Sequence, residues 1–262
     1  MAIHPRARIA DTARVDERAE IGADVEIGHF CVVDEEVSIG SRSQLESHVV
    51  VKRWTTLGTD NQISTGTVLG TDPLDENFSG ERSYLKIGNG NRIREHYTIS
   101  RGTEPESTTE IGDENYIMTS GHIAHNCKIG SRNIICSCAL VAGHVEIEDH
   151  VFVSGGVLVH QYSKIGRLAL ISGNTRVHQD TAPYFIYSDF KIRPRAVNII
   201  GLQRAGFQTE EIRRLKRAFN VLFRSGLSIN AALEQIEQEI SDEHTRHLVA
   251  FVRRSKRGIC RR

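Results

Sequence analysis

The chain has 262 residues, enough for one large domain with a buried core. Lysine plus arginine and aspartate plus glutamate both number 33, and this balanced charge argues against a protein that binds nucleic acid mainly by neutralising phosphates. No apolar run approaches the length of a membrane span and the first residues lack the apolar stretch of a secretory signal, so we expect a cytoplasmic protein.

Aliphatic residues recur every six positions over residues 9–69, 87–99 and 111–177. Of the 29 positions in this series, 26 are Ile, Leu or Val, and the exceptions are Asp75, Glu81 and Pro105. A period of six fits neither a helix nor a two-sided sheet. We therefore expect a parallel β-helix over residues 1–183, built from short strands and tight corners, with three hexads in each coil of 18 residues.

The two interruptions of the repeat predict loops that leave the β-helix, at about residues 70–86 and 101–110. Loops on a rigid scaffold are where binding groups tend to lie. Elsewhere a second stripe, four residues after each aliphatic, is often small or β-branched, as at Ala19, Cys31 and Ala139. Such side chains fit tight packing just inside a corner.

After Pro183 the repeat ends, and we expect a small helical C-terminal domain over residues 184–262. Thr209 is a candidate N-cap for a helix that continues to Gly226, and Ser228 and Ser241 are candidate caps for two more. An aromatic run is expected to anchor the junction between the two parts by packing. It comprises Tyr184, Phe185, Tyr187 and Phe190.

A step of one coil from His125 reaches Gly143, and a further step reaches Gln161. We call these three residues the 125–143–161 column. Histidines stand next to this column or three residues from it, at His122, His144 and His160. A single outward histidine is most simply a solvated surface residue, but several on consecutive coils within roughly 10 Å favour a functional site.

The histidines leave two chemistries open. A neutral imidazole can take a proton from an attacking hydroxyl or amine, and three imidazoles can hold zinc. Gly143 favours the first, because a backbone N–H without a side chain could approach a developing oxyanion. The five cysteines never have CxxC spacing, so we expect free thiols.

Several strings resemble the UDP-N-acetylglucosamine O-acyltransferase family of hexapeptide-repeat acyltransferases. They are GHIAHNCKIG, AGHVEIED one coil later, VHQYSKIG after that, and PYF followed by NIIGLQRAGF. The resemblance covers the whole chain and implies a left-handed β-helix. It also implies transfer of a 3-hydroxyacyl chain from acyl carrier protein to the 3-position of UDP-N-acetylglucosamine, the first step of lipid A synthesis. A homotrimer with sites between subunits, and no metal or dissociable cofactor, would accompany that activity.

Carried over residue by residue, the resemblance makes His125 the general base and His122 a substrate contact. Gly143 would supply the oxyanion N–H, and Gly173 would leave room for a long acyl chain. The other substrate-binding positions that it implies are Asp75, His144, Gly155, His160, Gln161, Asn198 and Arg204.

The chain departs from the family pattern at several positions, among them Ser137 and Cys138, where the pattern has a pair of asparagines. The residue after the base is usually aspartate but here is Asn126, which can orient an imidazole without stabilising its positive charge. Asn77, Ile200 and Ala205 stand where the family has a lysine, an acidic residue and an arginine that would bind the sugar nucleotide. A paralogue acting on another UDP sugar or a 3-amino sugar is therefore an alternative.

Two further alternatives come from other classes. One is a zinc enzyme of the γ-carbonic-anhydrase type, and the other is a binding protein that keeps the scaffold without turnover. The basic C-terminal tail is either a solvated helix end or a dock for acidic acyl carrier protein. Its basic residues are Arg246, Arg253, Arg254, Lys256, Arg257, Arg261 and Arg262.

Overall fold

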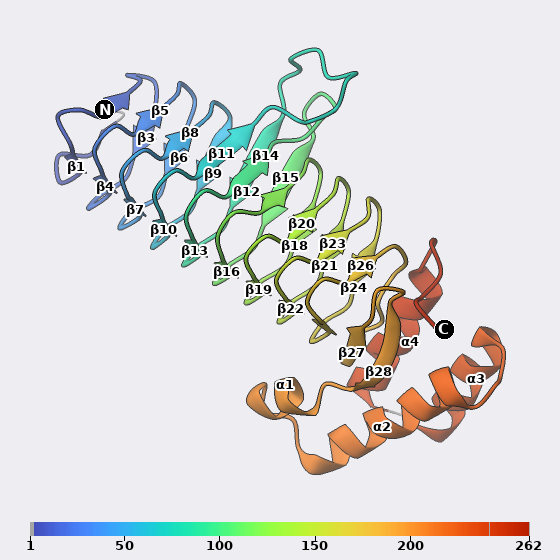
Figure 1. Cartoon of the computed structure of the whole chain (residues 1–262). Coiled ribbons are helices and arrows are strands. Elements are labelled where there is room, and N and C mark those ends of the chain that lie inside the picture. The colour runs from blue at the N-terminus through green and yellow to red at the C-terminus, as the bar shows by residue number, and fades with distance from the viewer. Residues whose placement is uncertain (1–2, 241, 262) are drawn as a thin grey trace.

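The computed structural model describes residues 3–240 and 242–261, and its main body is a long three-sided prism of short parallel strands (Figure 1). From β1 to β26, paired strands are three apart in chain order and parallel, so the strands form three stacks; β27 and the antiparallel β28 extend one of them. The expected β-helix over the first part of the chain is therefore present. At its far end the chain turns into four helices (Figure 1).

The first stack is an 11-stranded sheet. Its strands are β1 (Arg8–Ile9), β4 (Glu26–Ile27), β7 (Gln44–Leu45), β10 (Gln62–Ile63), β13 (Arg92–Ile93), β16 (Tyr116–Ile117), β19 (Ile134–Ile135), β22 (Phe152–Val153), β25 (Leu170–Ile171), β27 (Phe185–Ser188) and β28 (Arg193–Val197).

The other two stacks have nine and eight strands. The nine are β2 (Arg14–Val15), β5 (Val32–Val33), β8 (Val50–Val51), β11 (Val68–Thr71), β14 (Thr98–Ser100), β17 (His122–Ile123), β20 (Leu140–Val141), β23 (Leu158–Val159) and β26 (Arg176–Val177). The eight are β3 (Glu20–Ile21), β6 (Ser38–Ile39), β9 (Thr55–Leu57), β12 (Tyr84–Ile87), β15 (Thr108–Ile111), β18 (Lys128–Ile129), β21 (Glu146–Ile147) and β24 (Lys164–Ile165).

The hexad aliphatics fill the interior of the prism. From Ile21 to Val177 every aliphatic of the series is buried, whereas Ile9 and Val15, in the first coil, are half-buried because they lie at the end of the stack. The small residues four positions later are buried as well, and Gly121 leaves the space that the Tyr97 ring occupies. Tight packing of a narrow interior thus explains both stripes.

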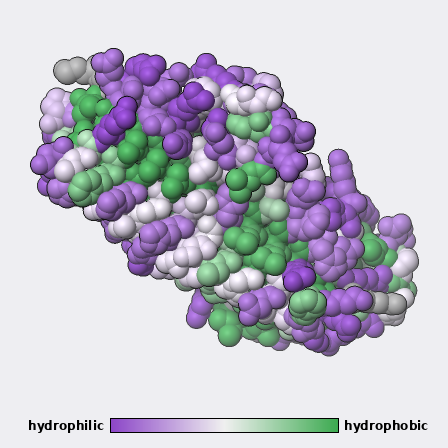
Figure 2. All heavy atoms as spheres, turned by 45° about the horizontal axis from the view of Figure 1, so that its top comes forward, coloured by the Kyte–Doolittle hydropathy of each residue, from purple (hydrophilic) through white to green (hydrophobic). Residues whose placement is uncertain are grey.

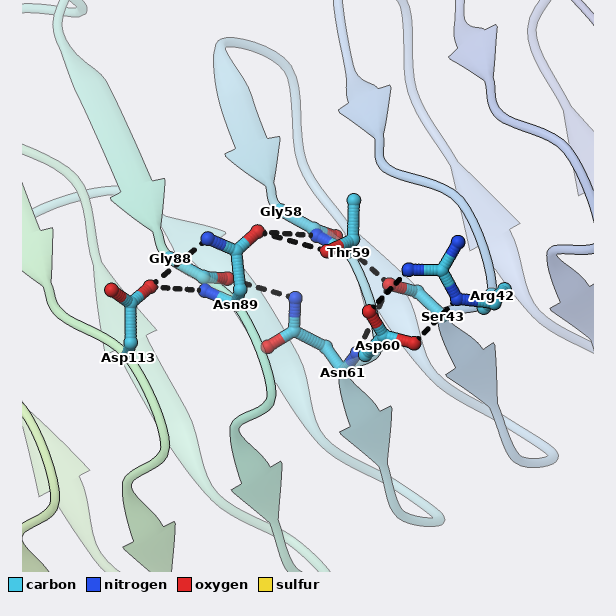
Figure 3. Close-up of polar contacts among 9 residues, drawn as sticks. All are labelled: Arg42, Ser43, Gly58, Thr59, Asp60, Asn61, Gly88, Asn89 and Asp113. Carbon is cyan, nitrogen blue, oxygen red and sulfur yellow. Dashed lines mark hydrogen bonds and ion pairs between the residues drawn. The ribbon is translucent and has the colours of Figure 1, made fainter.

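Polar side chains satisfy backbone groups at one edge of the prism. The Asn61 side chain accepts from the Asn91 backbone N–H at 2.9 Å, and Asn91 does the same for Asn115. A neighbouring ladder runs from Thr59 through Asn89, each side-chain oxygen taking a backbone N–H of the previous coil (Figure 3). Buried corner N–H groups would otherwise lack partners, so these ladders help to keep the coils in register.

Both predicted loops leave the prism, over residues 72–83 and 101–107, at the top of the view in Figure 1. Strand partners are 18 residues apart in most of the prism but 30 apart between β10 and β13 and 24 apart between β13 and β16. The loops therefore add 12 and 6 residues. The register between β11 and β14 shifts between Leu69 and Thr71, directly before the first loop, and the coils that follow the loops stack in regular register.

The helices begin later than the sequence indicates. Residues 185–197 form β27 and β28, which extend the first stack, so the first helix starts at Ile199. The strand β28 was missed because it contains Pro194, which suits only an edge strand such as this one. Of the aromatic run, Tyr184, Phe185 and Tyr187 are fully buried as expected, but Phe190 is 73% exposed.

The helices are α1 (Ile199–Arg204), α2 (Thr209–Arg224), α3 (Ile229–Glu239) and α4 (Glu243–Arg254). Thr209 is the first helical residue of α2 rather than its cap; the cap is Gln208, whose N–H donates to the Glu211 carboxylate at 2.7 Å. Ser228 caps α3 as predicted. Ser241 lies outside the described residues, and Asp242 caps α4.

The basic tail is mostly bound within the chain. Arg253 pairs with Glu237 at 2.6 Å, Arg254 lies 3.4 Å from Glu148, and Arg257 donates to the His178 carbonyl. These contacts tie the tail to the last coils and to α3, and Arg262 lies outside the described residues. No helix in residues 3–240 and 242–261 is long and apolar enough to cross a membrane.

Candidate active site

The 125–143–161 column places His125 directly against Gly143. A Cβ atom on Gly143 would lie 2.5 Å from Cε1 and 2.6 Å from Nε2 of His125, so the ring occupies the space that any side chain there would need. The φ of Gly143 is not in the left-handed region, so glycine is required here by space rather than by backbone geometry. No acceptor for its N–H occurs within the described part of the chain.

The Asn126 side chain orients the His125 ring. Asn126 has φ of 57°, a left-handed corner conformation that asparagine adopts readily. Its Oδ1 lies 2.9 Å from Nδ1 of His125 and also accepts from the N–H and the hydroxyl of Thr103, at 3.0 and 2.8 Å. The oxygen can only accept, so Nδ1 of His125 carries the proton and Nε2 has the free lone pair.

His144 adjoins His125, with ring centroids 5.2 Å apart, and stacks on Tyr162 at 4.6 Å. Burial, and then the nearby His125, lower the pKa of His144, although the carboxylates of Glu104 and Asp75 act in the opposite sense. These two acids come from the two loops, so both loops approach the histidines. Tyr162 has no counterpart among the residues that the sequence indicated.

His122 lies beside the pair on β17. Its Nδ1 is 2.7 Å from Oγ1 of Thr98, which is its partner in the adjacent strand. Its Nε2 is buried and has no hydrogen-bond partner in the described residues. A buried polar atom without a partner is costly, so this nitrogen is suited to a substrate group.

Burial lowers the pKa of His122, and His125 adds to the effect, while the contact with Thr98 opposes it. The unfolded chain therefore binds more protons than the folded one at this residue, so folding stability should fall as the pH drops below about 6.5. We expect Tm to depend less steeply on pH between about 7 and 5 in His122→Gln than in the wild type. Equal slopes in the two melting series would contradict this.

The first loop brings Asp75 to the site. Asp75 is half-buried, and its carboxylate accepts from the N–H and the side chain of Asn77 at 2.9 and 3.2 Å. Asn77 therefore holds the loop aspartate in place.

Arg101, only 1% exposed, fastens this loop to the prism. Its guanidinium pairs with Asp72 and lies 5.1 Å from the ring centres of Trp54 and Phe78. Arg101→Met should keep most of the packing but lose the charge-assisted contacts, which are worth about 1–3 kcal/mol. We expect a modest loss of stability in urea unfolding and a larger rise in KM for the acceptor than fall in kcat. Changes confined to kcat would exclude a role in fixing the loop.

Asn198 and Arg204 line a largely apolar pocket of about 870 Å³ between the prism and α1. Asn198 is nearly buried and already caps α1 through Gly201 while donating to the Leu168 carbonyl at 2.9 Å. Ile200 and Ala205 line the same pocket, which explains its apolar character at this end. Its wall also includes Ile134, Phe152, Leu168 and Leu170.

His160, Gly155 and Gly173 lie on the coils that follow His144. His160 is exposed, contacts the Gln161 carbonyl at 3.0 Å and lines a separate groove with Arg176 and Phe190. Gly155 and Gly173 stack on consecutive coils: a Cβ on Gly173 would lie 3.3 Å from the Gly155 carbonyl. Within residues 3–240 and 242–261, no group of three or more His, Cys, Asp or Glu side chains could hold a metal ion.

Comparison with known proteins identifies the family. A relative from Sulfurihydrogenibium, named acyl-(acyl-carrier-protein)–UDP-N-acetylglucosamine O-acyltransferase, is 52% identical over 98% of this chain and 93% of its own length. One of the same name from Thermodesulfovibrio yellowstonii is 39% identical over 97% of this chain and 99% of its own. The chain belongs to the UDP-N-acetylglucosamine O-acyltransferase family.

The family model described as UDP N-acetylglucosamine O-acyltransferase, domain 2, matches residues 180–260, which include all four helices. The crystal structure of a UDP-N-acetylglucosamine acyltransferase from Bacteroides fragilis is similar with a TM-score of 0.90 and 34% identity, over 99% of this chain and 100% of that one. That from Francisella novicida gives 0.87 and 34%, over 99% and 94%. These likenesses confirm the left-handed β-helix with a small helical C-terminal part.

Sequence reasoning missed Thr98, Thr103, Glu104 and Tyr162. Thr98 could have been found, because it precedes His122 by one coil plus the six residues that the second loop adds. Thr103 and Glu104 lie inside that loop, where the repeat assigns no position. Only the three-dimensional structure places Thr103 and Glu104 against Asn126, next to His125.

Proposed function

We propose that this chain transfers a 3-hydroxyacyl chain from acyl carrier protein to the 3-hydroxyl of UDP-N-acetylglucosamine, the first step of lipid A synthesis. The observation that carries the proposal is the arrangement of His125, whose Nδ1 proton is held by Asn126 and whose Nε2 lies over Gly143. The names and full-length similarity of the relatives support the choice of substrates.

In this reaction, Nε2 of His125 takes the proton from the sugar hydroxyl while its oxygen attacks the thioester carbonyl. The Gly143 N–H stabilises the oxyanion that forms. When the carbonyl is restored, the carbon–sulfur bond breaks and the proton passes from His125 to the leaving thiolate. Charge is thus balanced without a metal or a dissociable cofactor.

The remaining substrate contacts fit the same proposal. Asp75 and His122 would hold the sugar, His144, His160 and Gln161 would line the sugar and nucleotide region, and Asn198 and Arg204 would reach the nucleotide. Gly155 and Gly173 would leave space for the acyl chain.

A second candidate is transfer to a 3-amino sugar, which would give an amide. The observation that favours it is that few polar side chains are free to bind the acceptor. Ile200, which is 64% exposed, lines the pocket, and the Asn77 side chain is already hydrogen-bonded to Asp75. An amine is a better nucleophile than a hydroxyl, so weaker positioning would suffice.

One assay separates these functions. The purified protein would be given 3-hydroxyacyl carrier proteins of several chain lengths and either UDP-N-acetylglucosamine or its 3-amino analogue. Ester formation on the first supports the proposal, and turnover of only the second supports the alternative. Nucleotide-sugar binding without any turnover would favour a binding protein, and stoichiometric zinc in the purified protein would favour a metalloenzyme.

We also propose that the chain acts as a homotrimer in the cytoplasm. A histidine cluster on a flat outer wall needs a second wall, and large apolar side chains near it are exposed at Leu140, Leu158 and Tyr162. Figure 2 shows apolar side chains gathered near the middle of one face of the molecule. Sedimentation should give three times the 29.3 kDa of one chain, and a monomer would oppose the proposal.

A further inference from the structure

The second loop supplies an acidic partner for Asn126. While Oδ1 of Asn126 accepts from His125 and Thr103, its Nδ2 donates to Oε2 of Glu104 at 2.8 Å. The Ser107 hydroxyl and N–H both donate to the Glu104 carbonyl, at 2.7 and 3.0 Å, so the turn that presents Glu104 is itself held. A chain of contacts therefore connects the loop carboxylate to the His125 ring.

The orientation of the Asn126 amide follows from its neighbours. The Thr103 N–H can only donate and an ionised Glu104 can only accept. A flipped amide would place its NH₂ against the Thr103 N–H and its oxygen against a carboxylate. The observed orientation avoids both clashes and requires His125 to donate from Nδ1.

Glu104 is suited to remain ionised. Glu104 is exposed, and the slight desolvation that it undergoes opposes ionisation. Hydrogen bonds from Thr103, the Glu104 backbone, Asn126 and Ser107 outweigh this effect and lower the pKa of Glu104 below its usual value. A charged acceptor binds the amide NH₂ more strongly than a neutral one would.

We propose that Glu104 is a positioning residue that acts on His125 through Asn126. It fixes the amide orientation and thereby the Nδ1–H tautomer of His125, the only neutral form whose Nε2 can accept a proton. Its negative charge, passed on by the oriented amide dipole, also stabilises the imidazolium that forms after proton transfer. The proposal rests on the proposed role of His125 as general base.

The first test is a pair of substitutions that should compensate each other. Glu104→Gln keeps an acceptor but removes the charge and one of the two groups that oppose the flipped amide, so kcat should fall about 3–10-fold with KM within about twofold. Asn126→Asp sets two carboxylates in hydrogen-bond contact, and kcat should fall as well. Combined, the two changes restore a donor opposite a carboxylate, so the double variant should exceed both single variants.

Glu106→Gln is the matched control. Glu106 is an exposed acid of the same loop, but its carboxylate accepts from the Tyr84 hydroxyl at 2.7 Å and does not contact Asn126. The kcat of the Glu106→Gln variant should equal that of the wild type. A double variant no better than the poorer single one, or Glu104→Gln with wild-type kcat, would overturn the proposal.

The second test does not depend on turnover. In protein with ¹⁵N-labelled histidine, the nitrogen shifts of His125, assigned by their loss in His125→Gln, report its tautomer. We expect mainly Nδ1–H in the wild type and a larger Nε2–H share in Glu104→Gln. An unchanged tautomer would overturn the positioning role, whereas activity retained in His125→Ala would instead overturn the general-base function on which it rests.

Discussion

Replacing His125 by alanine should lower kcat about 10²–10⁴-fold, the usual contribution of a general base. The ring is held on one side by the Asn126 amide and lies over Gly143 on the other, and no other histidine in the described part of the chain combines both contacts. KM for either substrate should change far less than kcat, because the ring acts mainly after the substrates are bound.

The control is His48→Asn. His48 is another corner histidine, with φ of 60°, but it stacks on Phe30 in an early coil. Asparagine tolerates this backbone conformation, so the variant should fold and retain wild-type kcat. Initial rates and melting curves of both variants would be compared. Full acyl transfer by His125→Ala would refute the mechanism.

The second large effect is expected from Gly143→Ala. The added Cβ would lie within 2.6 Å of Nε2 of His125, so the ring must move away from the position where it meets the acceptor. A displacement of this kind, together with obstruction of the oxyanion N–H, should lower kcat about 10²–10³-fold. The same overlap should cost about 1–3 kcal/mol of folding stability.

A double-variant cycle isolates the cause. In a His125→Ala background the clash is absent, so adding Gly143→Ala should leave the unfolding free energy nearly unchanged. Urea titrations of the wild type, both single variants and the double variant would measure this coupling. If the glycine substitution destabilised both backgrounds equally, the backbone rather than the ring would be responsible.

The sequence was sufficient for the prism and for the column of site residues because both follow from periodicity. A strict spacing of six places Ile123 inside, and a spacing of 18 places Gly143 beside His125. His160 follows the same arithmetic yet lines a different groove, since residues next to a column can point around the corner. Periodicity thus predicts the coil of a residue better than the direction of its side chain.

The rest depends on contacts that no repeat encodes. Glu104 approaches Asn126 because the second loop folds back on the prism, and Arg101 holds the first loop through Trp54 and Phe78. The strands β27 and β28 were hidden for another reason. Proline in β28 and aromatic residues in β27 mask any alternation, and they become strands only because β27 pairs with β25 and β28 pairs with β27.

The two spacings have separate consequences for change in the sequence. Whether a side chain lies in the interior depends on its position within the six-residue repeat. Whether it lies at the site depends on its position within the 18-residue coil. If one hexad between His125 and Gly143 were removed, every later aliphatic would still point into the interior. Each later residue, however, would lie on a different face of the prism from the one that it occupies now. Such a protein would keep its hydrophobic interior while separating the base from its oxyanion donor. Length changes in multiples of 18, in contrast, preserve the faces, so this architecture can grow or shrink by whole coils without rotating one face against another.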